Sequence, residues 1–191
     1  MTLASCPETI RTERLILRRW REEDVARHAA LQAKPVVRRF FLRTMTLEEG
    51  EADARRHAES FERDGFGQWV VELPGAESFI GIAGVRRIDR EMPFEPLIDV
   101  GWHFLPAHWG QGYATEAARA ALRDVFTRVG LPEIVAYTAR PNLASQRVMQ
   151  RLGMTHDPAE DFAHPAAPEG HSLQMSALYR LRRDAFLAGT V

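Results

Sequence analysis

Apolar and polar residues alternate with the period of a strand in several short segments, and apolar residues recur with the period of a helix between them. Residues 14–20 have the strand pattern, and the acidic run Glu22–Asp24 begins a helix. A second helix starts with the capping-box pattern Thr46-Leu47-Glu48-Glu49 and runs to about Arg63, before Gly65. Further strands are predicted at 66–73, 79–88, 97–105 and from Glu133, and further helices from about Ala114 to Val129 and from Asn142 to Gly153.

The order of these elements predicts the class of fold. Hairpin-like strands come first, and strands alternate with helices later in the chain. Residues 154–183 are expected to form two strands joined by a loop that carries Pro and His. This order is typical of a mixed sheet flanked by helices, an α+β (mixed α/β) fold. The 191 residues, 45% of them hydrophobic, are expected to form a single domain over 1–191, with its core at about 11–182.

Composition and net charge exclude some classes of binding partner. A net charge of −1 gives the whole molecule no attraction to nucleic acid or to anionic membranes. The only cysteine is Cys6, which excludes an intramolecular disulfide, and Lys34 is the only lysine, so a lysine is not a plausible catalytic base. No apolar run approaches the ~20 residues of a membrane helix. We expect a cytoplasmic protein, a monomer or homodimer, whose partners are neither nucleic acid nor membrane.

The segment 109–116, Trp-Gly-Gln-Gly-Tyr-Ala-Thr-Glu, joins a predicted strand to a predicted helix. Gly110 and Gly112 allow backbone conformations that let several N–H groups converge at a helix N-terminus, where an anion such as a phosphate binds. A P-loop is not present, because Tyr113-Ala114 stand where Lys and Ser or Thr would follow the glycine. A dinucleotide fingerprint is matched only in part, and it remains an alternative, as does an ordinary loop that begins a helix.

A second motif, residues 140–154, reads Arg-Pro-Asn-Leu-Ala-Ser-Gln-Arg-Val-Met-Gln-Arg-Leu-Gly-Met and follows the strand-like segment 134–138. Together the two motifs closely resemble the acetyl-CoA-binding core of the GNAT family of N-acetyltransferases, in its RimJ/RimL-like branch. The resemblance extends from about Arg11 to Arg182 and is strongest over 99–154. It implies a GNAT-like, mostly antiparallel twisted sheet, and an enzyme that transfers acetyl directly from acetyl-CoA to an amine.

The resemblance also implies which residues hold acetyl-CoA. The pyrophosphate would lie against backbone N–H groups of the loop, and the pantetheine arm would lie along the strand from Trp102 to its end. Trp109 is expected to be buried beneath the loop. Arg147 or Arg151 would meet the 3′-phosphate, or would be ordinary solvated arginines. The cofactor residues expected are Phe104, Leu105, Gly110, Gln111, Gly112, Tyr113, Ala114, Thr115, Asn142 and Arg147.

Catalytic candidates lie on the same strand and on the Asn142 helix. Asp99 matches the position where many relatives have a Glu that takes a proton from the amine, usually through water, and His103 is the second candidate base. A β-bulge implied by the resemblance would turn His103 away from the face of Asp99. Ser145 would donate a hydrogen bond to the departing thiolate, since Met149 stands where many relatives have a Tyr. Asn142 would cap its helix and contact pantetheine.

The acceptor is not identified by these motifs. A protein N-terminus, as in a ribosomal protein, and a small-molecule amine are both open, and a non-catalytic acetyl-CoA sensor is the alternative function. Arginine pairs at 38 and 39, 55 and 56, and 86 and 87 could steer an acidic partner, or could form ordinary surface ion pairs with nearby carboxylates. A late acidic and His-bearing segment is expected to be a loop that closes over the acceptor and not a metal site: His156, Asp157, Glu160, Asp161, His164, Glu169 and His171.

Overall fold

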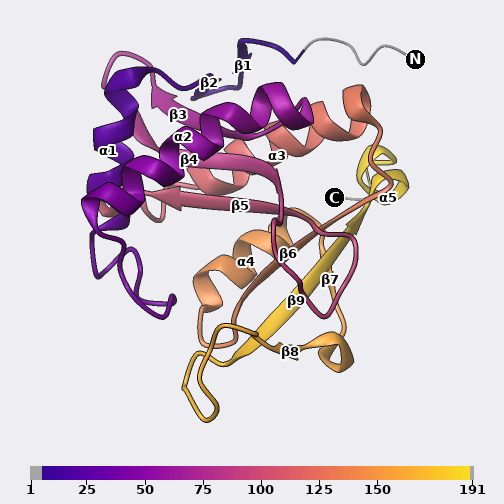
Figure 1. The fold of residues 1–191 in the computed structure, drawn as a ribbon. Helices are drawn as coiled ribbons and strands as arrows, with labels where there is room; N and C mark the ends of the chain where they lie inside the picture. Colours follow the sequence, from indigo (N-terminus) through magenta and orange to yellow (C-terminus); the bar gives the residue numbers. More distant parts are fainter. Residues whose placement is uncertain (1–5, 190–191) are drawn as a thin grey trace.

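The computed structural model describes residues 6–189 and shows helices on both faces of one central sheet (Figure 1). The strands are β1 (Thr9–Arg11), β2 (Ile16–Arg18), β3 (Gln68–Leu73), β4 (Glu77–Arg87), β5 (Ile98–Phe104), β6 (Glu133–Ala139), β7 (Thr155–His156), β8 (Phe162–Ala163) and β9 (Met175–Arg182). The α-helices are α1 (Glu22–Gln32), α2 (Leu47–Asp64), α3 (Tyr113–Asp124), α4 (Leu143–Arg151) and α5 (Arg183–Leu187). Short 3-10 turns lie at Pro106–His108 (η1) and Pro158–Glu160 (η3).

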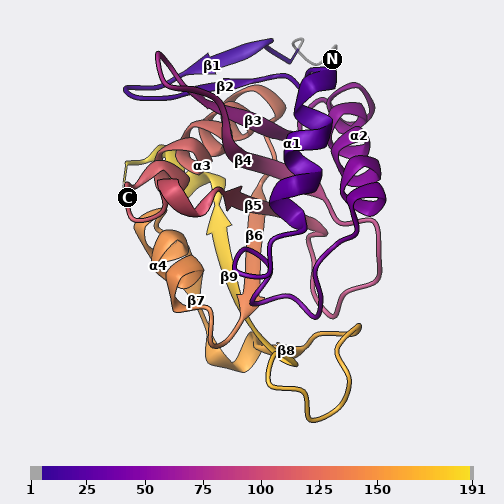
Figure 2. The ribbon, with the colours of Figure 1, turned by 90° about the vertical axis from the view of Figure 1, so that its left-hand side faces the viewer.

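The strands form one sheet in the order β1-β2-β3-β4-β5-β6-β9-β7, and β8 also pairs with β9 (Figure 2). Every neighbouring pair is antiparallel except β5 and β6, which are parallel. This confirms the predicted mixed and mostly antiparallel α+β fold. The parallel junction falls where the chain changes from hairpins to alternating strands and helices, because a parallel connection requires a crossover element and α3 supplies it.

The junction between β5 and β6 is narrow. β5 pairs with β4 without interruption, from Phe104 opposite Gly81 to Ile98 opposite Arg87. Its pairing with β6 is confined to Asp99 opposite Val135 within residues 6–189. The two strands therefore separate beyond Asp99, and the C-terminal half of β5 has β4 on one side only.

The prediction of a β-bulge in β5 is wrong. The continuous register with β4 keeps Asp99 and His103 on one face, because side chains alternate along an unbroken strand. The register shift in this part of the sheet lies instead between Val71 and Leu73 of β3, where it faces β4.

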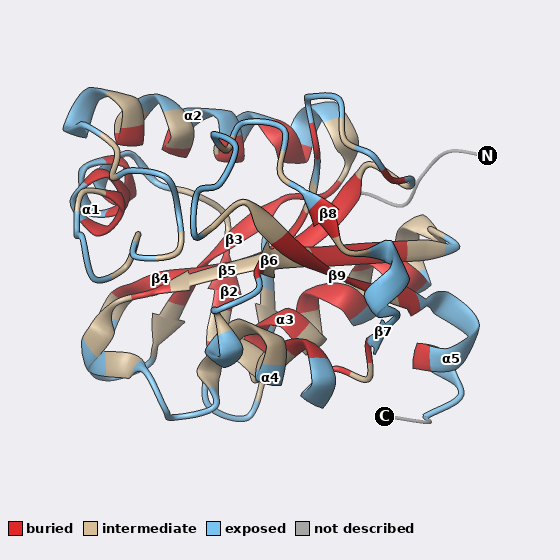
Figure 3. Ribbon diagram, turned by 90° about the horizontal axis from the view of Figure 1, so that it is seen from below, coloured by how far each residue is buried: buried red, intermediate tan, exposed pale blue. Residues whose placement is uncertain are grey.

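Two layers of helices cover the sheet (Figure 3). α1 and α2 lie on one face, where Leu31 packs against Val70 and Ile82. α3 and α4 lie on the other, where Leu122 and Met149 are fully buried with residues of β5, β6 and β9. Asp99 and His103 point to the α1 and α2 side, because Val100 and Phe104 occupy the cores on the opposite side.

Local sequence signals explain where the helices begin and end. Thr46 Oγ1 accepts from the Glu49 backbone N–H at 3.1 Å, and Glu49 Oε2 accepts from the Thr46 N–H at 2.9 Å, which confirms the predicted capping box. Gly65 ends α2 with φ of 74°. Asn142 Oδ1 accepts from the Ser145 N–H at 3.3 Å and caps α4 as expected.

Some predicted boundaries differ. α3 ends at Asp124 and continues as a π-helical segment, Val125–Val129 (η2), so the predicted helix is present in two geometries. The late region holds β7 and β8 besides β9, and β1 was not predicted. These strands have two or three residues, which is too short for an alternating pattern to be recognised. Within residues 6–189, no helix combines the length and apolar character needed to span a bilayer.

Candidate active site

The loop before α3 adopts the conformation that its glycines predict. Gly110 and Gly112 have φ of 76° and 81°. Gly112 is the N-cap of α3 and supplies no side-chain acceptor, so the first N–H groups of α3 have no side-chain cap. A Cβ added at Gly110 would meet nothing within 4 Å, so the space beside the loop is open. Uncapped donors at a positive helix end are suited to a phosphate.

The hydroxyl of Thr115, in the first turn of α3, is buried and has no hydrogen-bond partner among residues 6–189. A buried hydroxyl without a partner carries a desolvation penalty, and native proteins generally satisfy such groups. Its position beside the uncapped N–H groups places a further donor or acceptor at the same point. The residues present therefore fit a pyrophosphate.

Two residues that the sequence analysis missed hold this loop in place. Thr12 Oγ1 donates to Glu116 Oε1 at 2.6 Å, and Arg14 Nε donates to Glu116 Oε2 at 2.7 Å. Arg14 Nη1 also donates to the Gln111 carbonyl at 2.9 Å. Burial alone would raise the pKa of Glu116, but these hydrogen bonds outweigh it and lower the pKa. No local pattern marks Thr12 or Arg14, because both are about a hundred residues from the loop.

A cavity of about 1170 Å³ passes through the gap between β5 and β6. It reaches from the loop and α4 on one side of the sheet to α2 and the α1–α2 loop on the other. Of the predicted site residues, it is lined by Asp99, His103, Phe104, Gly110, Gly112, Tyr113, Ala114, Thr115, Asn142, Ser145 and Arg147. A second cavity, of about 920 Å³, adjoins the loop and is lined by Gln111.

Leu105 and Trp109 are placed differently from expectation. Leu105 lines neither cavity; its N–H donates to the Ile80 carbonyl at 2.9 Å, and its side chain packs with the α1-side core. Trp109 is 39% exposed, so the prediction that it is buried is wrong. Its indole N–H donates to the Phe104 carbonyl at 2.8 Å, which occupies one of the backbone acceptors at the end of β5.

Ser145 and Asn142 are joined in one hydrogen-bond group. Asn142 Nδ2 donates to Thr138 Oγ1 at 2.9 Å and to Ser145 Oγ at 3.0 Å. Among the described residues the Ser145 hydroxyl only accepts, so its own proton is available to a further acceptor. Met149, on the same helix face, is 2% exposed and belongs mainly to the core.

Comparison with known proteins identifies the family. The model of the "Acetyltransferase (GNAT) domain" family matches residues 14–155. The chain belongs to the GNAT family. A RimL ribosomal L7/L12 alpha-N-protein acetyltransferase, solved with coenzyme A, superposes with a TM-score of 0.72 over 93% of this chain and 99% of that one, at 17% identity.

Two relatives show how far the sequence similarity extends. The FsC-acetyl coenzyme A-N(2)-transacetylase of Aspergillus fumigatus is 38% identical over 96 residues, which are 48% of this chain and 40% of that protein. The match thus spans less than half the length of that relative. The uncharacterized N-acetyltransferase YnaD of Bacillus subtilis is 28% identical over 162 residues, 85% of this chain and 89% of YnaD.

On the side of the sheet that faces α1 and α2, Asp99 forms an ion pair. It is 4% exposed, and its two oxygens accept from Arg86 Nε at 2.8 Å and Nη2 at 3.1 Å. The charge of Asp99 raises the pKa of Arg86 further, so the guanidinium stays protonated. Each carboxylate oxygen keeps a lone pair with which to contact an amine or a water.

His103 has a specific hydrogen-bond partner. Its Nδ1 lies 2.6 Å from Gln32 Nε2, and Gln32 Oε1 accepts from Arg38 Nη1 at 3.3 Å. The Gln32 amide nitrogen therefore faces His103 and can only donate, so Nδ1 must hold a lone pair. Burial, together with the charges of His28, Arg86 and Arg38, lowers the pKa of His103 to about 3. Because Nδ1 is engaged, the geometry favours Asp99 over His103 as the proton acceptor.

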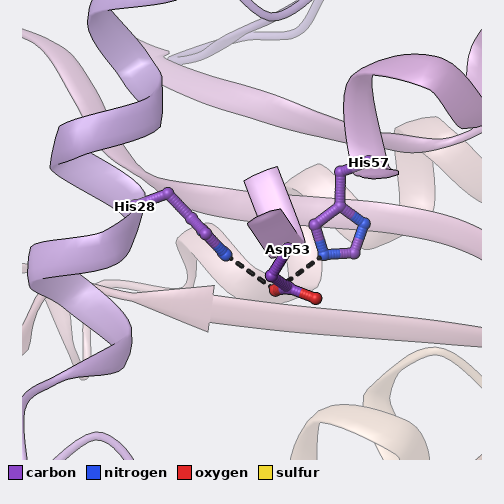
Figure 4. A group of neighbouring side chains, drawn as sticks. All are labelled: His28, Asp53 and His57. Carbon is purple, nitrogen blue, oxygen red and sulfur yellow. Dashed lines mark hydrogen bonds and ion pairs between the residues drawn. The ribbon is translucent and has the colours of Figure 1, made fainter. Parts of the chain in front are cut away.

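A third polar group ties α1 to α2 (Figure 4). Asp53 Oδ2 lies 2.9 Å from His28 Nε2 and 3.3 Å from His57 Nε2, and Asp53 Oδ1 accepts from Arg56 at 2.9 Å. Burial would raise the pKa of Asp53, but the two imidazoles hold it well below its usual range. Burial also lowers the pKa of His57. The three could hold a metal ion, yet these hydrogen bonds already satisfy the carboxylate, which indicates a structural role.

The late His-bearing segment is held by ion pairs. Asp161 accepts from Arg140 at 2.7 Å and from His156 at 2.8 Å, and Arg180 pairs with Glu160 at 2.8 Å. Within residues 6–189, no group of potential metal ligands is found in this segment. His164 lines the large cavity, so part of the segment reaches it. Its closure over an acceptor stays a prediction.

Proposed function

We propose that this chain is an acetyl-CoA-dependent N-acetyltransferase that transfers the acetyl group directly to a primary amine. The observation that carries the proposal is the continuous cavity between β5 and β6. It joins the uncapped N-terminus of α3, where a pyrophosphate fits, to Ser145 and to the acceptor face that carries Asp99. Two substrates can therefore approach each other from opposite sides of the sheet.

The residues that would hold acetyl-CoA follow from this cavity. The N–H groups of 110–115 and the Thr115 hydroxyl would hold the pyrophosphate. The free side of β5 near Trp102 and Phe104 would bind the pantetheine amides in the manner of an added strand. Asn142 and the exposed Arg147 line the same cavity. When bound, acetyl-CoA supplies an already activated acyl carbon, so positioning contributes much of the rate.

Two side chains would handle protons. Asp99, which is hydrogen-bonded to Arg86, would accept the amine proton, directly or through a water. Ser145, whose hydroxyl proton is available, would donate a hydrogen bond to the departing sulfur. A covalent acyl-enzyme is disfavoured, because Cys6 lines neither cavity and burial raises the pKa of its thiol.

The class of the acceptor amine is also part of this proposal. The RimJ/RimL-like motifs favour a protein N-terminus, and a small-molecule amine is the other class that the cavity would accept. A cytoplasmic enzyme that acts as a monomer or homodimer is consistent with the composition.

The test is coenzyme A release from acetyl-CoA in the presence of a panel of amines, with product mass measured in parallel. We expect amine-dependent release and an acetylated product. Binding of acetyl-CoA without any product would instead indicate a sensor, and a melting temperature raised by NAD but not by coenzyme A would indicate a dinucleotide-binding protein.

A matched pair of variants tests the loop. Gly110 and Gly75 have the same φ of 76°, and a Cβ at either position would meet nothing within 4 Å. Gly110→Ala and Gly75→Ala therefore impose the same backbone strain, on the order of 1 kcal/mol. We expect only Gly110→Ala to weaken the binding of coenzyme A. Equal affinities in the two variants would contradict the proposed pyrophosphate site.

A further inference from the structure

The acceptor side of the cavity is rich in arginine, although the whole chain has a net charge of −1. Four carboxylates line the cavity: Glu49, Asp53, Asp89 and Asp99. Eight arginines line it on the side of α2, the α1–α2 loop and the β4–β5 region: Arg38, Arg39, Arg43, Arg56, Arg63, Arg86, Arg87 and Arg90. The potential at this end is therefore positive, which favours a ligand with negative charge.

Most of these arginines have a carboxylate partner. Arg43 pairs with Glu49 at 2.6 Å and Arg86 with Asp99 at 2.8 Å. Arg63 pairs with Asp64 at 2.7 Å and with Asp89 at 3.6 Å, and Arg87 pairs with Asp64 at 3.5 Å. Arg56 pairs with Asp53 at 2.9 Å. Three arginines, at 38, 39 and 90, have no carboxylate oxygen within 4.0 Å in the described part of the chain.

Arg38 differs from the other two in its burial and its neighbours. Arg39 is exposed, and Arg90 donates to the Tyr137 hydroxyl at 2.7 Å. Arg38 is half-buried, and its guanidinium carbon lies 3.8 Å from the ring centre of Phe41. Burial lowers its pKa, and the more distant charges of Asp53 and Glu49 only partly offset this effect. A half-buried arginine without an anion is costly in the free protein.

Two hydrogen bonds orient the guanidinium of Arg38, and its remaining N–H groups are not used by them. Nε donates to the Arg43 carbonyl at 3.1 Å and Nη1 to Gln32 Oε1 at 3.3 Å. An arginine has five N–H groups, so three remain for a ligand. Gln32 also contacts His103 of β5, so Arg38 is tied to the strand that carries Asp99.

We propose that the acceptor amine carries a carboxylate and that Arg38 binds this carboxylate at the acceptor end of the cavity. This inference rests on the proposed acetyltransferase function and narrows its substrate class. A carboxylate matches the fork of a guanidinium and supplies the charge that Arg38 lacks. Polycationic amines are excluded as preferred acceptors, because they would meet the arginine-rich lining. The carboxylate can belong to a small amino acid or to an acidic side chain of a peptide.

The experiment measures kcat/KM for acceptors that differ only in this charge. One arm compares an amino acid with its amide, and a second compares two peptides with Asp or Asn at the second position. Spermidine is included as a polycationic acceptor. We expect the carboxylate member of one pair to be preferred by about ten- to a hundredfold, the worth of a charge-assisted hydrogen-bond pair. The arm that shows the preference identifies the source of the carboxylate.

The matched variants are Arg38→Gln and Arg55→Gln. Arg55 is an exposed arginine of α2 outside the cavity, so its removal controls for net charge. Arg38→Gln should abolish the preference through a higher KM for the carboxylate acceptor, with the KM for acetyl-CoA unchanged. Arg38→Lys keeps the charge but not the forked guanidinium, so it should retain part of the preference for the carboxylate acceptor. Arg55→Gln should retain the whole preference.

The two levels of inference fail in different ways. The carboxylate assignment would be overturned if turnover were equal for acid and amide, or highest with spermidine, and were unchanged by Arg38→Gln. The acetyltransferase function would then still stand. Absence of acetyl-CoA turnover with every amine would overturn the proposed function itself.

Discussion

Replacement of His103 by Asn tests the electrostatics of the acceptor face. In the folded protein the pKa of His103 is lowered to about 3, whereas an imidazole in the unfolded chain titrates near ~6.5. An Asn side chain cannot be protonated in this range, and its carbonyl oxygen can accept from Gln32 as Nδ1 does. The substitution therefore removes the titration while it preserves a hydrogen bond.

The sign of the effect follows from proton binding. Between pH 6.5 and about 3 the unfolded chain binds a proton at His103 and the folded protein does not. The free energy of unfolding therefore decreases as the pH falls through this window, by about 1.4 kcal/mol per pH unit once the pH is well below 6.5. From pH 7.5 to 5.0 the loss from His103 alone is about 2 kcal/mol.

The assay is urea denaturation of the wild type and of His103→Asn at both pH values. The wild type should lose about 2 kcal/mol more than the variant on acidification. The other histidines, His57 among them, are common to both proteins and cancel in the difference. A titration of His103 followed by NMR gives its pKa directly. Equal losses in the two proteins, or a measured pKa near 6.5, would refute the reasoning.

Five further perturbations have defined outcomes. Asp99→Asn should lower kcat by about a hundredfold if the carboxylate accepts the amine proton, and Ser145→Ala should also lower kcat; unchanged turnover in both would leave positioning as the mechanism. Thr115→Val should weaken coenzyme A binding, since the buried hydroxyl has no other partner among residues 6–189, and an equal Kd would contradict its role. Asp53→Asn should reduce the free energy of unfolding by on the order of 3 kcal/mol, measured by urea denaturation, because it removes the negative charge that the two imidazoles and Arg56 share; a change below 0.5 kcal/mol would exclude the cluster as a support. Treatment with EDTA should leave the melting temperature unchanged, and a drop would indicate a metal at that cluster.

The layer between the sheet and helices α1 and α2 holds a connected group of polar side chains. Polar groups are paired across it by hydrogen bonds from four elements: Gln32 from α1, Asp53 from α2, Arg86 from β4 and Asp99 from β5. A buried layer of this kind is stable only when its members are satisfied together. Arg38 has no carboxylate partner in the described part of the chain, which is why the acceptor is inferred to complete it.

Local sequence signals were sufficient to predict the elements and the loop. The capping box at Thr46 and Glu49, the glycines of 110–112 and the cap at Asn142 act over three or four residues, so their geometry follows from local chemistry. The two motifs around 109–116 and 140–154 were sufficient to indicate the GNAT family.

Only the tertiary structure decided which side chains face each other. The arginines at 55 and 56 were predicted to act as a pair, yet Arg56 lines the large cavity and Arg55 does not. Trp109 was expected to be buried beneath the loop, whereas it is partly exposed and its indole N–H donates to the Phe104 carbonyl. Thr12 and Glu116, or Gln32 and His103, meet across more than seventy residues of chain. Such contacts depend on strand order, register and the divergence of β5 from β6, and no periodicity in a single sequence specifies these.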